Sequence, residues 1–250
     1  MYDPPGYIWA ITTAGAIAFP AATCAVLYSG AIRSGLSRAR AALLTGGAAA
    51  VLGGWLIASA EIGGHGWYHT RLGHGVPWMP IAVVGYLGLL LALRQIPAVA
   101  RALTAPGMAG RLELPHTFRI AGIALLLMMA LGHLPALFAV PAGLGDIATG
   151  LAAPFVAARL ARGTGRRAAW WLNWFGLGDL VMALTLGALT AYQVVITHPT
   201  GGLISELPLV LIPTTGVPLL LTLHITSLST LTRLGRAQPP TETRVPVTVG

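Results

Sequence analysis

Two aspartates with identical neighbours are the residues of this sequence best suited to chemistry. Asp146 ends the segment Gly143-Leu-Gly-Asp146, and Asp179 ends a second copy, Gly176-Leu-Gly-Asp179. Both copies lie inside apolar runs that are long enough to cross a bilayer. An ionisable side chain inside a membrane span is costly and marks a functional site by default. We therefore expect Asp146 and Asp179 to form the centre of a site.

Three kinds of chemistry fit two close carboxyl groups in a low dielectric. Both groups cannot easily ionise, so one holds a proton unless a cation lies between them. Without a metal, the protonated aspartate would be a general acid and its partner a base or cation stabiliser. In a carrier, the pair would bind and release protons or ions. With a divalent metal such as Zn, Fe or Mn, the ligands would come from a mixed carboxylate and imidazole set, Asp146, Asp179, His133, Glu61, His65 and His69.

A structural role is the competing interpretation for each of these residues. A buried aspartate in a membrane bundle can simply hydrogen-bond across helices. His133 precedes Pro135 near the expected membrane interface, where a structural hydrogen bond is equally suited to it. His65 and His69 have the spacing of a ligand pair on a helix, but the glycines around them favour a solvated loop.

Composition places the chain in a membrane. Of its 250 residues, 55% are hydrophobic and 9% are charged, and the mean hydropathy is +0.75, whereas about a quarter of a soluble domain is charged. The net charge of +8 comes from short arginine clusters between apolar runs. No basic face with interleaved aromatic residues is present, which excludes nucleic acid as a partner. All 15 basic residues are arginine, so a retinal Schiff base to lysine is excluded.

The apolar runs predict an all-α integral membrane protein with seven transmembrane helices. The spans cover about residues 7–29, 41–62, 79–93, 119–134, 140–160, 168–196 and 207–229. Residues 1–232 are expected to form one domain, followed by a flexible cytoplasmic tail over 233–250 that is polar and rich in proline. Pro208, Pro213 and Pro218 predict that the seventh helix is kinked and lines something polar.

Arginine positions predict the orientation of these spans. The 1–2, 3–4 and 5–6 connections and the tail hold every arginine except Arg71. The positive-inside rule then puts the N-terminus outside and the C-terminus in the cytoplasm. Richness in Ala, Gly and Arg without Lys is typical of GC-rich codons, so we expect the plasma (inner) membrane of a bacterium.

Helical rise converts these spans into depths above the cytoplasmic surface. Three ionisable side chains on successive helices share a level roughly 17–22 Å up, His133, Asp146 and Asp179. Glu61 lies above them at roughly 30 Å, beneath the loop that holds His65 and His69. His224 and Asn173 are expected near the cytoplasmic end. The glycines beside both aspartates would let the fifth and sixth helices approach closely.

Three segments carry a resemblance to known proteins. Residues 133–146, 172–180 and 207–213 resemble stretches of uncharacterised bacterial multi-pass membrane proteins, a resemblance that implies no activity. The seven spans, outside N-terminus and core acids are also similar in architecture to the integral-membrane terpene cyclases. That similarity implies an isoprenoid substrate that is protonated by an acidic side chain.

Together these observations favour a membrane-embedded enzyme that acts on a lipophilic substrate, a lipid or an isoprenoid, by acid–base or metal-assisted chemistry. Asp146 and Asp179 would be the central pair, with His133 and Glu61 assisting, and membrane lipids would surround the protein. The first alternative is a proton- or ion-coupled transporter, suggested by the proline-broken helix and the repeated motif. The second is a haem protein with His133 and a loop histidine as axial ligands.

Overall fold

The described part of the chain is helical throughout, as predicted. The computed structural model describes residues 2–69 and 76–236, and these contain no β-strand. Arg71 and His74 lie outside the described residues, as does most of the predicted tail. The long helices are α1 (Gly6–Arg33), α2 (Arg38–Gly64), α3 (Trp78–Leu93), α7 (Ala136–Ala161), α8 (Arg166–Ala191) and α9 (Val217–Arg236).

Shorter helical pieces complete two of the spans. α5 (Met108–Arg111), η1 (Leu114–Gly122) and α6 (Ile123–Ala130) together form one apolar span of 23 residues. α4 (Pro97–Leu103) follows α3 after a bend of 86°. Within the described ranges, six helices are long and apolar enough to cross a membrane, or seven if α3 and α4 count as one broken span. The chain is therefore a multi-helix membrane protein.

Local sequence explains where several of these helices begin. Pro135 immediately precedes α7, and Pro97 occupies the first turn of α4, where its missing N–H is not needed. Ser37 caps α2, because its side chain accepts a hydrogen bond from the N–H of Arg40. Gly165 precedes α8 with a left-handed φ of 78°, a conformation that glycine adopts without strain.

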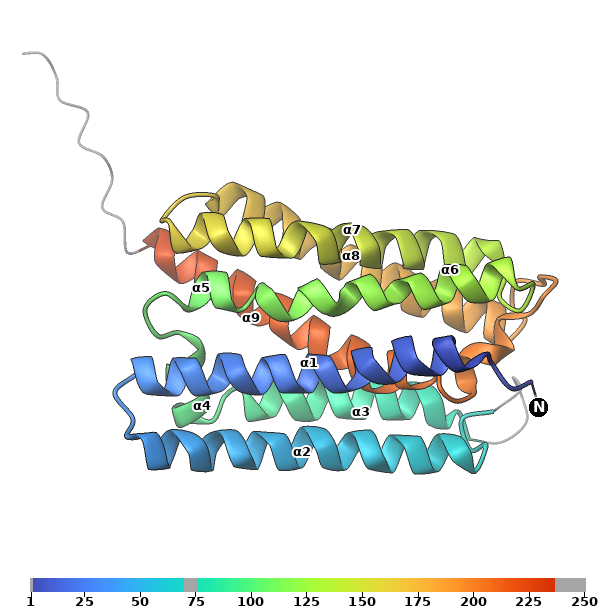
Figure 1. The fold of residues 1–250 in the computed structure, drawn as a ribbon, viewed down its shortest axis with the longest axis horizontal. Coiled ribbons are helices and arrows are strands. Elements are labelled where there is room, and N and C mark those ends of the chain that lie inside the picture. The colour runs from blue at the N-terminus through green and yellow to red at the C-terminus, as the bar shows by residue number, and fades with distance from the viewer. Residues whose placement is uncertain (1, 70–75, 237–250) are drawn as a thin grey trace, which may run out of the picture.

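The helices form two groups with α9 between them (Figure 1). In one group α1 packs on α2, and α3 meets α2 through the stacked rings of Trp55 and Tyr86. In the other group α7 packs on both α6 and α8. α9 crosses obliquely between the groups and packs on both α3 and α8. Most of its apolar residues are buried. α9 is thus the element that both halves of the molecule share.

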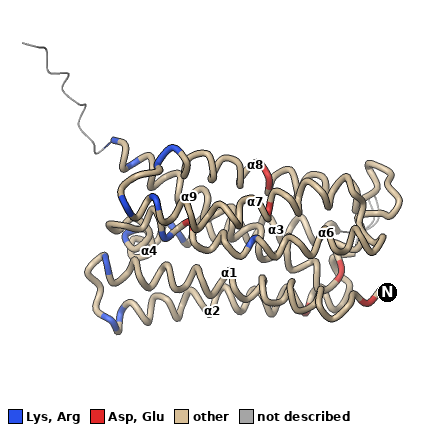
Figure 2. The backbone as a smooth tube through the Cα atoms, turned by 45° about the horizontal axis from the view of Figure 1, so that its top comes forward, with Lys and Arg blue, Asp and Glu red and all other residues tan. Residues whose placement is uncertain are grey.

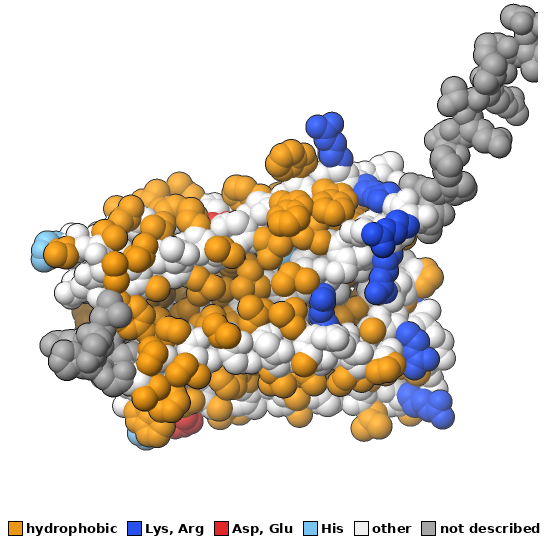
Figure 3. Space-filling view, turned by 180° about the vertical axis from the view of Figure 1, so that it is seen from behind, with side chains coloured by type: hydrophobic (Ala, Val, Ile, Leu, Met, Phe, Trp, Pro, Cys, Tyr) orange, Lys and Arg blue, Asp and Glu red, His pale blue; other side chains and the backbone are white. Residues whose placement is uncertain are grey.

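Charge is distributed as a membrane protein requires. The basic residues gather at one end of the bundle, where α1 joins α2 and α7 joins α8 (Figure 2). Apolar side chains cover the rest of the face seen from behind, from the arginine-rich end to the opposite end (Figure 3). The exceptions lie away from both ends of the bundle: acidic residues on α7 and α8, and the arginine of η1.

Two of the predicted spans have different limits in the structure. The fourth was expected to begin near residue 119 but begins at Met108, because the 3₁₀ segment η1 accommodates Pro115 in its first turn. The seventh was expected over 207–229, but its regular helix begins at Val217 and continues through Arg236. Its first part is the π-helical segment η3 (Ile212–Gly216), which contains Pro213. Both shifts change which side chains lie near the middle of these two spans.

The prolines free a backbone carbonyl that another helix satisfies. Pro218 has no N–H, so the carbonyl of Thr214 lacks its usual helical partner. The indole N–H of Trp55 on α2 donates to this oxygen at 2.8 Å. Ser59, one turn further along α2, donates to the Thr214 hydroxyl at 2.7 Å. The broken start of the last span is therefore attached to α2 by polar contacts, in agreement with the polar lining predicted from the prolines.

Candidate functional site

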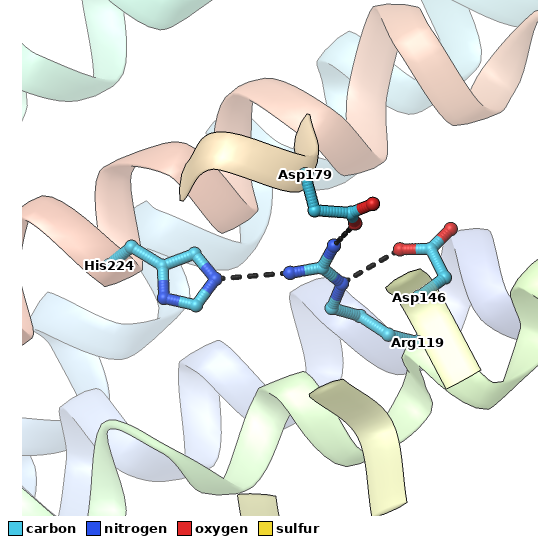
Figure 4. A network of polar contacts seen from close by, with 4 residues as sticks. All are labelled: Arg119, Asp146, Asp179 and His224. Atoms are coloured by element: carbon cyan, nitrogen blue, oxygen red, sulfur yellow. Dashed lines mark hydrogen bonds and ion pairs between the residues drawn. The ribbon is translucent and has the colours of Figure 1, made fainter. Parts of the chain in front are cut away.

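A buried arginine joins the two predicted aspartates. Arg119 lies in η1 and is 1% exposed. Its Nε donates to Asp146 Oδ1 on α7 at 2.7 Å, and its Nη2 donates to Asp179 Oδ2 on α8. Its Nη1 donates to His224 Nε2 on α9 at 3.1 Å (Figure 4). One guanidinium therefore holds side chains from three other helices, with both aspartates ion-paired to it.

The contacts continue toward the arginine-rich end of the bundle. His224 Nδ1 lies 2.8 Å from Asn173 Oδ1, and Asn173 Nδ2 donates to Glu113 Oε1 at 2.7 Å. Ser227 also donates to Glu113 Oε1, at 2.6 Å. We call the connected set the Arg119 network; its members are Glu113, Arg119, Asp146, Asn173, Asp179, His224 and Ser227.

Hydrogen-bond partners set the protonation of His224. Arginine can only donate, so the nitrogen that faces Arg119 must be an acceptor. The proton then resides on Nδ1 and is donated to the Asn173 carbonyl oxygen. His224 is therefore a neutral link between the guanidinium and Asn173.

Two glycines of the repeated motif make this packing possible. A Cβ at Gly145 would overlap the Asp179 carboxyl group, and a Cβ at Gly176 would overlap the His224 ring. Outside the motif, Gly122 lies directly against Asp146 in the same way. Gly178, by contrast, has no atom within 4 Å of an added Cβ. The expected close approach of α7 and α8 is confirmed, and it is Gly145 that provides it.

Several buried polar atoms of this region have no hydrogen-bond partner within residues 2–69 and 76–236. These include Asp179 Oδ1, Glu113 Oε2 and both ring nitrogens of His116. The His116 ring stacks on that of His224, with centroids 3.8 Å apart. A buried polar atom without a partner is unfavourable. The Arg119 network is thus incompletely satisfied, with spare capacity for protons at its carboxyl groups.

Two small cavities adjoin Asp146. A cavity of about 40 Å³ borders Arg119 and Asp146, with Thr12 and Phe19 of α1 on its far wall. Another, of about 50 Å³, lies between Asp146 and Phe138. Each has room for a few water molecules, whereas pockets for drug-sized ligands measure about 300–1,000 Å³.

The other predicted site residues lie elsewhere. His133, in the loop before α7, stacks on the Tyr2 ring with centroids 3.7 Å apart. It is separated from Asp146 by ten residues of α7 or more, roughly 15 Å along the helix axis. Glu61 and His65 are exposed at the end of α2. His69 is also exposed, with its Nε2 3.6 Å from Glu206 Oε1. The structure therefore does not bring these four residues to the aspartate pair.

The expected metal ligands do not fit a metal ion. In the part of the chain that the structure describes, no three His, Cys, Asp or Glu side chains are placed to hold one. The position between the two carboxylates, where a metal was expected, contains the guanidinium of Arg119. The haem alternative stays a prediction; in the structure His133 packs on Tyr2 and His69 lies near Glu206.

Five members of the Arg119 network were not predicted as site residues: Glu113, Arg119, Asn173, His224 and Ser227. Arg119 was placed at the cytoplasmic start of the fourth span, yet both it and Glu113 lie inside the span that begins at Met108. His224 was expected near the cytoplasmic end of its span. Because α9 continues to Arg236, His224 lies twelve residues, roughly 18 Å, from the end of the helix. Asn173 lies seven residues, roughly 10 Å, from the start of α8 at Arg166. Electrostatics could have predicted Arg119 from the sequence, because two carboxylates expected at mid-membrane require a cation at the same depth.

Comparison with known proteins identifies the family of this chain but assigns no activity to it. Residues 76–232 match a family described as a domain of unknown function, DUF8737. The chain belongs to this family. No curated protein and no solved structure matches it. Every member of the Arg119 network lies within the matched range, whereas α1, α2, Glu61, His65 and His69 lie before it. The family domain alone therefore supplies the network.

Proposed function

We propose that this protein is a proton-coupled membrane transporter in which the Arg119 network binds and releases the protons. The observation that carries the proposal is the pairing of one buried guanidinium with two carboxylates at mid-span, connected to a third carboxyl group. We further propose seven spans in a bacterial plasma membrane with the N-terminus outside, supported by the arginines at one end of the bundle (Figure 2).

Charge balance supports protons as the coupled species. The Arg119 network contains three carboxyl groups, Asp146, Asp179 and Glu113, and one guanidinium. His224 accepts from Arg119 and is therefore neutral. If all three acids were ionised, the network would carry two uncompensated negative charges, which a bilayer interior strongly disfavours. Protons on the carboxyl groups restore neutrality, and their release would favour a different conformation or a bound cation.

The carboxyl groups lie at the two ends of the network. Glu113 precedes Arg119 by six positions, which is roughly 9–12 Å along the helix axis. His224, Asn173 and Ser227 bridge this distance. Glu113 lies nearest the arginine-rich end, and Asp146 borders the small cavities beside α1 and Phe138. Arginine keeps its proton and an asparagine amide does not pass one on, so we propose that Glu113 exchanges protons with the arginine-rich side and Asp146 through the small cavities.

The same geometry makes an acid–base enzyme the less favoured function. The two cavities that border Asp146 measure about 40–50 Å³, which is too small for a lipophilic substrate. Both carboxylates are also engaged by Arg119, and their helices are in contact through Gly145. Protonating an isoprenoid at this pair would need the helices to separate first.

Proteoliposomes with an entrapped pH-sensitive dye test the transporter. Pulses of alkali-metal salts, organic cations and organic acids are applied outside, and the internal pH is followed. We expect one cargo class to drive a pH change that is lost in Asp179→Asn and Asp146→Asn. The matched control is Asp3→Asn, an exposed acid that contacts Trp9 outside the network.

Infrared spectroscopy separates proton binding from a fixed structural cluster. The C=O stretch of protonated carboxylic acids is recorded while the pH of the purified protein is stepped. A band that appears in the unmodified protein and is lost in Glu113→Gln or Asp179→Asn supports the proposal. No band, together with no variant-dependent pH change for any cargo, would identify the Arg119 network as purely structural.

A further inference from the structure

A long apolar groove lies on the opposite side of α9 from the Arg119 network. It has a volume of about 330 Å³, within the range of ligand pockets, and is formed by α1, α2, α3, α4 and α9. Its walls are almost entirely aliphatic and include Leu27, Leu44, Leu90, Val99, Leu219 and Leu223. The hydroxyls of Thr222 and Thr226 also line it, but both donate to carbonyls of their own helix. The groove therefore offers hydrocarbon contacts along its length.

One end of this groove opens into a polar, basic space. A second cavity, of about 290 Å³, is lined by Arg94, Gln95, Thr104, Ser229, Thr230 and Arg233. Arg94, Leu103 and Thr226 line both cavities, so the two spaces adjoin. The mouth lies at the bend between α3 and α4, where Arg94 follows the last residue of α3. Neither Arg94 nor Arg233 pairs with a carboxylate within the described ranges.

We propose that this site binds an anionic phospholipid from the surrounding bilayer. An acyl chain occupies the groove, and the phosphate lies between Arg94 and Arg233. An apolar channel that ends in two unpaired arginines at the membrane boundary has the chemistry of one molecule, a long hydrocarbon chain with a negative head. Basic pockets between transmembrane helices recognise anionic head groups through the same combination of contacts. The site is independent of the proposed proton transport.

The position of the groove gives the lipid contact with the last helix. Leu223 lines the groove, while the next residue, His224, belongs to the Arg119 network. Successive residues on a helix point in directions about 100° apart, so one helix presents both surfaces. A lipid in the groove therefore packs directly against the helix that carries His224.

Native mass spectrometry of the detergent-solubilised full chain tests the site. Phosphatidylglycerol and phosphatidylcholine with identical acyl chains are titrated in parallel. We expect the protein to retain phosphatidylglycerol preferentially, and the double variant Arg94→Gln/Arg233→Gln to bind it about 30-fold more weakly. Arg236→Gln, an exposed arginine of the same helix that lines neither cavity, is the control and should bind normally.

A second pair of variants tests the groove itself. Gly47 lines it and has no atom within 4 Å of an added Cβ, so Gly47→Phe fills the space without a clash at Cβ. Gly46→Phe is the control, because Gly46 is equally open but lies outside the lining. We expect only Gly47→Phe to release the lipid. Equal retention of the two lipids by the unmodified protein would overturn the proposal, as would equal effects of the two phenylalanines.

Discussion

Removing Arg119 should destabilise the protein far more than removing either of the aspartates that it holds. Arg119→Gln leaves Asp146 and Asp179 without their cation among largely buried side chains. Breaking a buried ion pair by deleting one partner costs about 3–5 kcal/mol, because the remaining charge stays buried. The variant also loses the hydrogen bond to His224. We therefore expect a loss at the upper end of that range.

The aspartate variants should behave differently because they do not leave an excess charge. In Asp179→Asn, Arg119 keeps Asp146 as a carboxylate partner at 2.7 Å, so the pair stays neutral. Loss of one charge-assisted hydrogen bond then costs about 1–3 kcal/mol. The triple variant Arg119→Gln/Asp146→Asn/Asp179→Asn removes all three charges and should recover most of the stability that Arg119→Gln loses.

Reversible unfolding in mixed detergent micelles, followed by circular dichroism, measures these differences. Arg162→Gln serves as the matched control, since Arg162 is exposed at the end of α7 and should change stability by less than about 0.5 kcal/mol. A loss of unfolding free energy in Arg119→Gln as small as that in Arg162→Gln would contradict this prediction. A triple variant no more stable than Arg119→Gln would contradict it as well.

Two further predictions concern packing around the network and the proline-rich segment. Gly145→Ala should lower the free energy of unfolding by about 1–3 kcal/mol, because the new methyl group overlaps Asp179. Gly178→Ala has open space around its new methyl group and should leave stability unchanged. Thermal unfolding of both variants measures the difference. Trp55→Phe should lower the free energy of unfolding by about 1–3 kcal/mol, because it leaves the Thr214 carbonyl without its hydrogen bond. The loss should be smaller in a Pro218→Ala background, where the backbone N–H of residue 218 is restored. A double-mutant cycle measures this difference.

Apolar runs predicted the helices well because length and hydropathy suffice to identify a membrane span. α1, α2, α3 and α7 begin and end within a few residues of the limits expected from the sequence. The close approach of α7 and α8 was also predictable, because glycines beside a polar residue indicate helix contact. These features depend on local composition, which a sequence displays directly.

Side chains that join the site from a distance were harder to predict. Arg119 was assigned to a cytoplasmic connection because arginines usually mark that boundary. The rule fails where a buried acid pairs with the arginine, and that pairing links residues far apart in the chain, Asp146 and Asp179 with Arg119. His133 shows the converse error. Its expected depth was similar to that of Asp146, but depth does not set the distance between side chains, and its ring packs on Tyr2.

An arginine between two acids has a different consequence from a metal ion in the same place. A divalent cation would neutralise both carboxylates and leave no charge to be balanced. A single guanidinium neutralises one of Asp146 and Asp179, so the pair is neutral only when it also holds a proton. Glu113 repeats this requirement at the other end of the network, where it contacts uncharged Asn173 and Ser227. We therefore expect the number of bound protons to change with how closely η1, α7, α8 and α9 pack, which is the property that the proposed proton-driven conformational change requires.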